Sequence, residues 1–175
     1  MYSKTRIAGH PLHPILVAVP IALFAGTIGL QLAHIGTQDP FYYRAAMIAN
    51  IAGVIAGLLA AIPGALDLFS IPKHTRARVT GDRHAVFNLA AVGAFAVSAV
   101  LLYRGWDNRM LVEGGYNLDA HVPLAISLVG FVSMAIAGLL GYALVHTHRI
   151  GEKAPAVRRP ARAALRPISV LRPAH

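Results

Sequence analysis

Four long apolar runs constrain the fold of this chain more than any other feature. They cover about residues 12–35, 45–66, 85–103 and 122–145, and none of them contains Asp, Glu, Lys or Arg. An α-helix rises about 1.5 Å per residue, so runs of this length cross the roughly 30 Å hydrocarbon core of a bilayer. The sequence therefore predicts four transmembrane helices.

Composition argues against a water-soluble alternative. Of the 175 residues, 56% are hydrophobic and 13% are charged, and the mean hydropathy is +0.57. Too little polar surface remains to cover a soluble bundle. The first run is longer than the apolar part of a signal peptide and lacks a small-residue cleavage site. Because the runs also lack two-residue alternation, we expect an all-α integral membrane protein, a four-helix antiparallel bundle with minimal strand content.

The distribution of basic residues predicts the orientation of the helices. Lys and Arg are in excess before the first run, between the second and third, and after the fourth, whereas the connections 36–44 and 104–121 carry no basic excess. Basic segments remain on the cytoplasmic side of membranes. Both termini are therefore expected in the cytoplasm. Aromatic residues lie at the expected outer interface: Phe41, Tyr42, Tyr43, Tyr103, Trp106 and Tyr116.

The C-terminal segment differs in composition from the rest. We divide the chain into a transmembrane domain, residues 1–151, and a basic Pro/Arg-rich cytoplasmic tail, residues 152–175. Such a tail either lies on anionic lipid or docks on a partner subunit of a membrane complex, and the sequence favours neither. Because the basic residues follow the expected topology, the net charge of +9 does not predict nucleic acid as a partner.

Short repeated strings indicate an internal duplication. The string Ala-Gly-Leu-Leu occupies residues 56–59 and again 137–140, and an Arg-x-x-Gly pattern occupies residues 6–9 and 78–81. Each half then comprises one helical hairpin that begins and ends on the cytoplasmic side. The sequence therefore predicts two parallel-repeated hairpins, related by a pseudo-two-fold axis along the membrane normal.

Histidines near the expected cytoplasmic ends of the helices form the candidate cofactor site. In the predicted repeat, His13 corresponds to His84 and Asp67 to His148, and convergence of these side chains near the axis would create a ligand cluster. Neutral imidazole binds divalent metals and haem iron. We expect His13 and His84 to be the ligands of haem b or a metal. The supporting or alternative ligands are Asp67, Asn88, His10 and His148.

A purely structural interpretation of these histidines stays open. Histidines near helix ends also bond to carbonyl groups or across helices, and Asp67 has basic neighbours in sequence. The chain has no cysteine, which excludes disulfides, thiolate metal sites and covalent c-type haem. On the outer side His34 and His121 are candidates for a second pair. His13 and His34 are 21 positions apart, or about 31 Å, which is long for direct electron transfer between two haems.

Neither catalysis nor ion transport is predicted. The chain contains no Gly-rich phosphate loop, nucleophile elbow or carboxylate pair placed for acid–base chemistry. Transport pathways need polar groups at the membrane midplane, where we find mainly Ser98, Ser133 and the flanking Asn50. We therefore expect a non-enzymatic protein.

Several short motifs resemble the membrane family catalogued as domain of unknown function 2231. They are Gly9-His10-Pro11-Leu12-His13-Pro14, Leu66-Asp67, His84 with Asn88, and Gly141 followed by Leu144 and His148. The resemblance covers roughly residues 7–151. It implies a four-span protein of the bacterial inner membrane. Some members are joined to Rieske-type iron–sulfur domains, which implies an electron-transfer setting. Here the closing motif lacks a double glycine and adds His146.

Two functions follow from these observations. The first is a membrane subunit whose cytoplasmic-side histidines bind haem b or a metal, with a redox or cofactor-stabilising role. The second is a cofactor-free structural subunit that packs against a larger membrane complex through its Gly/Ala-rich faces and basic tail. Both predict lipid and membrane-protein partners.

Overall fold

The computed structural model describes residues 6–7 and 10–150, with side chains from residue 12 onward. Its helices are α1 (Leu12–Leu16), α2 (Ala18–Thr37), α3 (Pro40–Ser70), α4 (Arg76–Asp107) and α5 (His121–His146). Two short antiparallel hairpins accompany them, β1 (Arg6–Ile7) with β2 (His10–Pro11) and β3 (Leu111–Val112) with β4 (Gly115–Tyr116).

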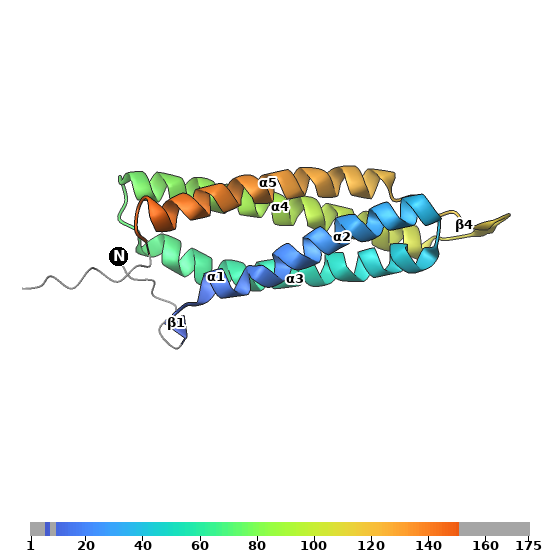
Figure 1. Cartoon of the computed structure of the whole chain (residues 1–175), viewed down its shortest axis with the longest axis horizontal. Coiled ribbons are helices and arrows are strands. Elements are labelled where there is room, and N and C mark those ends of the chain that lie inside the picture. Colours follow the sequence, from blue (N-terminus) through green and yellow to red (C-terminus); the bar gives the residue numbers. More distant parts are fainter. Residues whose placement is uncertain (1–5, 8–9, 151–175) are drawn as a thin grey trace, which may run out of the picture.

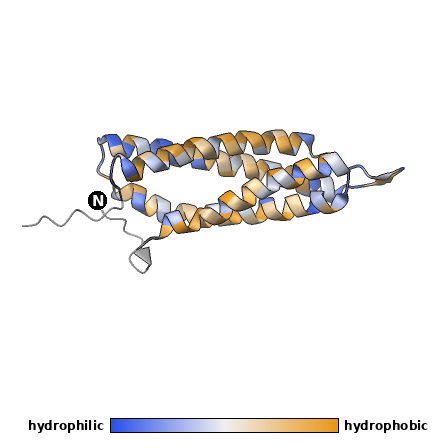
Figure 2. Ribbon diagram, viewed as in Figure 1, coloured by the Kyte–Doolittle hydropathy of each residue, from blue (hydrophilic) through white to orange (hydrophobic). Residues whose placement is uncertain are grey.

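The helices form an elongated bundle of four rods, one of which combines α1 and α2 (Figure 1). The rod formed by α1 and α2 packs on α3, α3 on α4, α4 on α5, and α5 on α2, so the four rods enclose a common core. Each is long and apolar enough to cross a membrane. Figure 2 shows apolar residues along the rods and polar residues gathered near both ends of the bundle. The prediction of an all-helical protein with four candidate spans is confirmed.

The observed helices extend beyond the predicted spans, most clearly at the start of α4. This helix begins at Arg76 rather than near residue 85, because the Thr75 hydroxyl accepts the backbone N–H of Arg78 at 3.1 Å. Likewise α3 begins at Pro40, with the Asp39 carboxylate accepting the backbone N–H of Phe41 at 2.8 Å. Hydropathy marks only the lipid-covered part of a helix, whereas polar capping residues fix its ends.

Prolines have different effects on the first two rods. The rod is divided at Val17 into α1 and α2, although the Val17 backbone stays right-handed helical and its N–H donates to the His13 carbonyl at 3.1 Å. Pro20 has no N–H to donate to the Leu16 carbonyl one turn earlier, which weakens the helix at this point. Pro63 lies inside α3, which continues through it to Ser70. The division therefore lies near Pro20, whereas Pro63 leaves its helix continuous.

Close helix packing at the centre of the bundle depends on glycine. The Phe24 and Phe95 rings stack with centroids 3.9 Å apart and planes 9° apart. A Cβ atom on Gly53 would lie 2.8 Å from the Phe24 ring, and one on Gly130 would lie 2.9 Å from the Phe95 ring. Each glycine thus lets a neighbouring helix approach an aromatic ring, as small residues do in membrane bundles.

Asp119 stabilises the start of α5, and we expect this contribution to depend on pH. Its carboxylate accepts the backbone N–H of His121 at 2.8 Å and lies 2.7 Å from the Nδ1 atom of the same residue. These bonds, the backbone bond first, hold the pKa of Asp119 below its ordinary value. A carboxyl group with a lowered folded-state pKa stabilises the fold above its unfolded pKa, and this stabilisation is lost as the pH falls through the folded value.

We therefore expect Asp119→Ala to lower the free energy of unfolding at pH 7 by about 0.5 kcal/mol, the low end for a capping residue because the side chain is 69% exposed. Asp119→Asn keeps a capping oxygen but cannot titrate, so it should be less sensitive than the wild type to acid below about pH 4. Thermal unfolding in detergent at neutral and acidic pH measures both effects. Asp107→Ala, at an exposed position on α4, is the control. An alanine variant as stable as the wild type at pH 7 would exclude this capping role.

Candidate histidine site in the bundle core

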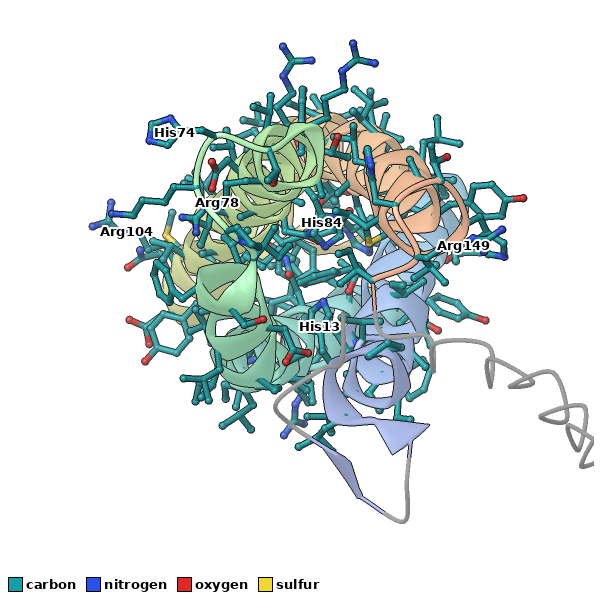
Figure 3. All side chains as sticks on the ribbon, turned by 90° about the vertical axis from the view of Figure 1, so that its left-hand side faces the viewer. His13, His74, Arg78, His84, Arg104 and Arg149 are labelled. Atoms are coloured by element: carbon teal, nitrogen blue, oxygen red, sulfur yellow. The ribbon has the colours of Figure 1, made fainter. Side chains whose placement is uncertain are left out.

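Two of the predicted site residues meet inside the bundle. His13 on α1 and His84 on α4 lie with ring centroids 6.1 Å apart and planes at 89°. Viewed along the bundle from this end, both side chains point into the space enclosed by the helices, whereas those of His74, Arg104 and Arg149 lie at its outer margin (Figure 3). Both histidines are half-buried. The two imidazoles thus form a pair contributed by opposite helices.

Each imidazole is oriented by a carbonyl group on a neighbouring helix. The Nδ1 atom of His13 lies 2.8 Å from the carbonyl oxygen of Ala60 on α3, and that of His84 lies 2.8 Å from the carbonyl oxygen of Ala137 on α5. Because a carbonyl oxygen only accepts hydrogen bonds, Nδ1 is the nitrogen that carries the proton in these bonds. In the neutral ring, Nε2 then keeps its lone pair and is able to bind a metal.

A glycine one turn beyond each of these carbonyls makes room for the ring. A Cβ atom on Gly64 would lie 2.9 Å from the Cε1 and Nδ1 atoms of His13. On Gly141 it would lie 3.0 Å from the Cε1 atom of His84. No side chain larger than hydrogen fits at these positions without moving the ring. Each histidine is therefore bounded by the same two features, a carbonyl acceptor and a glycine that lies against the ring. We call Gly64 and Gly141 the glycine wall.

Asn88 belongs to the site, as its spacing from His84 predicts. Its Nδ2 atom lies 2.9 Å from the backbone oxygen of His84 and 3.1 Å from the His84 Nε2 atom. The same Nδ2 atom lies 3.4 Å from the His84 Nδ1 atom, so the amide lies against the face of the ring and leaves the in-plane Nε2 lone pair open.

Among the described residues, His148 and Asp67 do not form a three-ligand group with this pair. The His148 Nε2 atom lies 3.2 Å from the Thr80 hydroxyl. Asp67 lies one turn beyond Gly64, and its backbone oxygen accepts the Ser70 hydroxyl. Across residues 12–150, no group of three or more His, Cys, Asp or Glu side chains is placed to hold one metal ion. The predicted convergence of four ligands at one depth therefore does not occur, and the side chain of His10 lies outside the described residues.

Matching contacts correct the sequence alignment of the two halves. Equivalent contacts lie 71 residues apart on the first and third rods (84 minus 13, 95 minus 24) and 77 apart on the second and fourth (137 minus 60, 141 minus 64). The identical Ala-Gly-Leu-Leu strings are 81 apart, one helical turn out of this register. Their leucines face away from the core, Leu59 being 57% and Leu139 72% exposed. A spacing of 77 residues from Asp67 leads to Leu144, whereas the predicted repeat matched Asp67 with His148.

At the opposite end, His34 and His121 do not pair. His34 is only 2% exposed, with Nδ1 3.0 Å from the Asp39 carbonyl oxygen and Nε2 3.1 Å from the Leu118 carbonyl oxygen. It thereby links the end of α2 to the connections before α3 and α5. His121 is exposed and contacts Asp119 instead. The sequence predicts His34 at the end opposite His13 but gives no sign that its side chain is buried.

These features define a helical membrane protein with four spans and an interior histidine pair. A family model described as "Predicted membrane protein (DUF2231)" matches residues 9–154. The chain therefore belongs to this membrane-protein family, which confirms the resemblance drawn from the motifs. No curated protein and no solved structure is significantly similar to it.

Proposed function

We propose that this protein is a non-enzymatic membrane subunit that holds the iron of a haem b between His13 and His84. One observation carries the proposal, namely the matched setting of the two rings. Each Nδ1 bonds to a carbonyl at 2.8 Å, each ring lies against a glycine, and the ring centroids are 6.1 Å apart.

The number of ligands favours haem over a bare metal ion. Zinc and similar divalent ions take four or more ligands, and none of the carboxylate or histidine side chains described in residues 12–150 joins the pair as a third. Haem iron already has four porphyrin nitrogens and needs only two axial ligands, which histidine commonly provides.

The surrounding groups have defined roles in this proposal. A haem supplies one-electron redox chemistry when it is bound. His13 and His84 would bind it. The carbonyls of Ala60 and Ala137 fix the ring orientations by accepting hydrogen bonds from the Nδ1–H groups, and these bonds make the Nε2 atoms better ligands. Asn88 lies against the His84 ring from the next turn of α4 and helps to position it. Enclosure by apolar helices limits access of water to the site.

Orientation and symmetry complete the proposal. The parallel repeat of two hairpins is supported by the matched contacts, and such a repeat explains why a pair of equivalent ligands meets near one axis. The basic residues at the histidine end favour its location on the cytoplasmic side of a bacterial inner membrane, with both termini inside. The tail, residues 152–175, is proposed as a docking arm for a partner subunit.

The alternative is a structural subunit in which both histidines serve only as links between helices. The His13–Ala60 and His84–Ala137 bonds join α1 to α3 and α4 to α5, and interhelical bonds of this kind contribute about 0.6 kcal/mol in membranes. This alternative predicts no cofactor and a small loss of stability in each alanine variant.

The test is a visible spectrum of the full chain in mild detergent, before and after titration with haemin, in oxidised and dithionite-reduced forms. We expect b-type bands in the wild type and in His121→Ala, whose exposed side chain lies at the far end. His13→Ala and His84→Ala should each lose the six-coordinate spectrum. Elemental analysis of the same samples reports any other metal. A wild type that stays colourless after haemin titration would overturn the proposal, as would an unchanged spectrum in both variants.

A further inference from the structure

A second polar feature lies deep in the bundle, apart from the histidines. Each long helix contributes a fully buried polar residue at this level, namely Thr27, Asn50, Ser98 and Ser127. Thr27 and Ser98 lie three residues after Phe24 and Phe95, and Asn50 and Ser127 lie three residues before Gly53 and Gly130. All four therefore lie beside the aromatic stack, on the side toward the β3–β4 hairpin. Gln31, also fully buried, lies one turn further along α2. We call these five residues the polar layer.

Hydrogen bonds connect part of the polar layer. The Ser98 hydroxyl lies 2.9 Å from the Ser127 hydroxyl and donates to the Pro123 carbonyl oxygen at 3.1 Å. The Gln31 amide donates to Ser98 at 3.3 Å, and the Thr27 hydroxyl donates to the backbone within its own helix. Gln31, Ser98 and Ser127, from three different helices, are therefore directly connected, whereas Thr27 and Asn50 are not bonded to them.

Three atoms of the polar layer are buried without a hydrogen bond among the described residues. They are the Gln31 Oε1 atom and both amide atoms of Asn50, Nδ2 and Oδ1. A buried polar atom without a partner costs about 1–3 kcal/mol, so native proteins pair such atoms, often with ordered water. The three unpaired atoms belong to side chains with 0% exposure, which bulk solvent does not reach.

We propose that the polar layer binds ordered water molecules. The chemistry of the unpaired atoms selects water over a cation. Asn50 presents a donor and an acceptor, and Gln31 presents an acceptor. A cation accepts no bond from the Nδ2 group, whereas one water molecule both donates and accepts. A buried water needs two to four polar partners, and the serine hydroxyls add to those of the two amides.

The structure also limits how far this water extends. Toward the histidine end, the stacked Phe24 and Phe95 rings close the core immediately beside the layer. In the other direction the Tyr43 hydroxyl, seven residues before Asn50 on the same buried face of α3, is also unpaired among the described residues. The water therefore occupies the half of the bundle toward the β3–β4 hairpin. It is separated from the histidine pair by the aromatic stack and does not depend on haem binding.

X-ray hydroxyl-radical footprinting of the full chain in detergent tests this site, because radicals formed from buried water modify side chains that bulk solvent cannot reach. Phe24 and Phe95 are the reporters, at 2% and 0% exposure, and the 67% exposed Phe41 is the internal reference. We expect both buried rings to be modified in the wild type. Asn50→Leu should lower this modification several-fold and leave Phe41 unchanged.

Two further variants keep the test decisive if Asn50→Leu fails to fold. Ser127→Ala removes one hydroxyl from the layer and should also reduce modification of Phe24 and Phe95. Ser133→Ala, on the same helix outside the layer, should leave it unchanged. Far-UV circular dichroism identifies any variant that fails to fold. Absence of modification in the wild type would overturn the proposal, and equal modification in folded Asn50→Leu and Ser127→Ala would do the same.

Discussion

Replacing Gly141 by leucine is expected to abolish haem binding without unfolding the bundle. A Cβ atom at this position would already lie 3.0 Å from the His84 ring, and the remaining carbons of leucine need space that the ring occupies. The imidazole must therefore move, which breaks its 2.8 Å bond to the Ala137 carbonyl and changes the position of the ring relative to His13. An axial ligand displaced by about 1 Å loses much of its function. Gly64→Leu should act in the same way on His13.

The chain provides a matched control on the same helix. No atom lies within 4 Å of a Cβ built on Gly138, so Gly138→Leu adds the same side chain to α5 without touching His84. Haemin titration followed by visible spectroscopy should show wild-type binding for Gly138→Leu and loss of the six-coordinate spectrum for Gly141→Leu. If Gly141→Leu bound haem as the wild type does, the glycine wall would have no role in the site. That result would leave the separate histidine substitutions to decide the proposed function.

The four helices were predictable because hydropathy reports directly on lipid contact. The ends of the helices were less predictable, because the start of α4 depends on Thr75, a single capping residue outside the apolar run. The His13 and His84 pair was predictable for the same kind of reason, since two histidines beginning equivalent apolar runs reach the same depth. The sequence did not indicate which residues would face them.

The repeat register shows why short identical strings mislead in such a chain. The two copies of Ala-Gly-Leu-Leu face the core differently, because Gly57 is buried in the first and Ala137 in the second, while Leu59 and Leu139 are exposed. The contacts with the rings instead require small residues at Gly64 and Gly141, whose surrounding letters differ. The polar layer was also only partly visible. Asn50 and Ser98 stood out near the midplane, but Thr27 and Ser127 are common in membrane helices, and only the structure brings all four to one level.

Truncation of Phe95 to alanine is expected to destabilise the bundle by about 3 kcal/mol. The ring is fully buried, stacks on Phe24 at 3.9 Å and lies against Gly130, which has no side chain to fill the space that would be left. Between membrane helices the loss comes from dispersion contacts rather than from transfer to water. Unfolding by a denaturing detergent, followed by helical circular dichroism, measures the change. Phe131→Ala, at a 38% exposed position beside Gly130, should cost less than about 1 kcal/mol.

The Phe24→Ala variant and the double variant complete a thermodynamic cycle. Because the two rings contact each other directly, we expect them to couple by about 0.5–1.5 kcal/mol, so the double variant should lose less than both single variants together. Additive losses would show that each ring packs independently against its own glycine. The stack also stands between the polar layer and the histidine pair, and its coupling energy therefore measures how firmly the apolar barrier between the two sites is held.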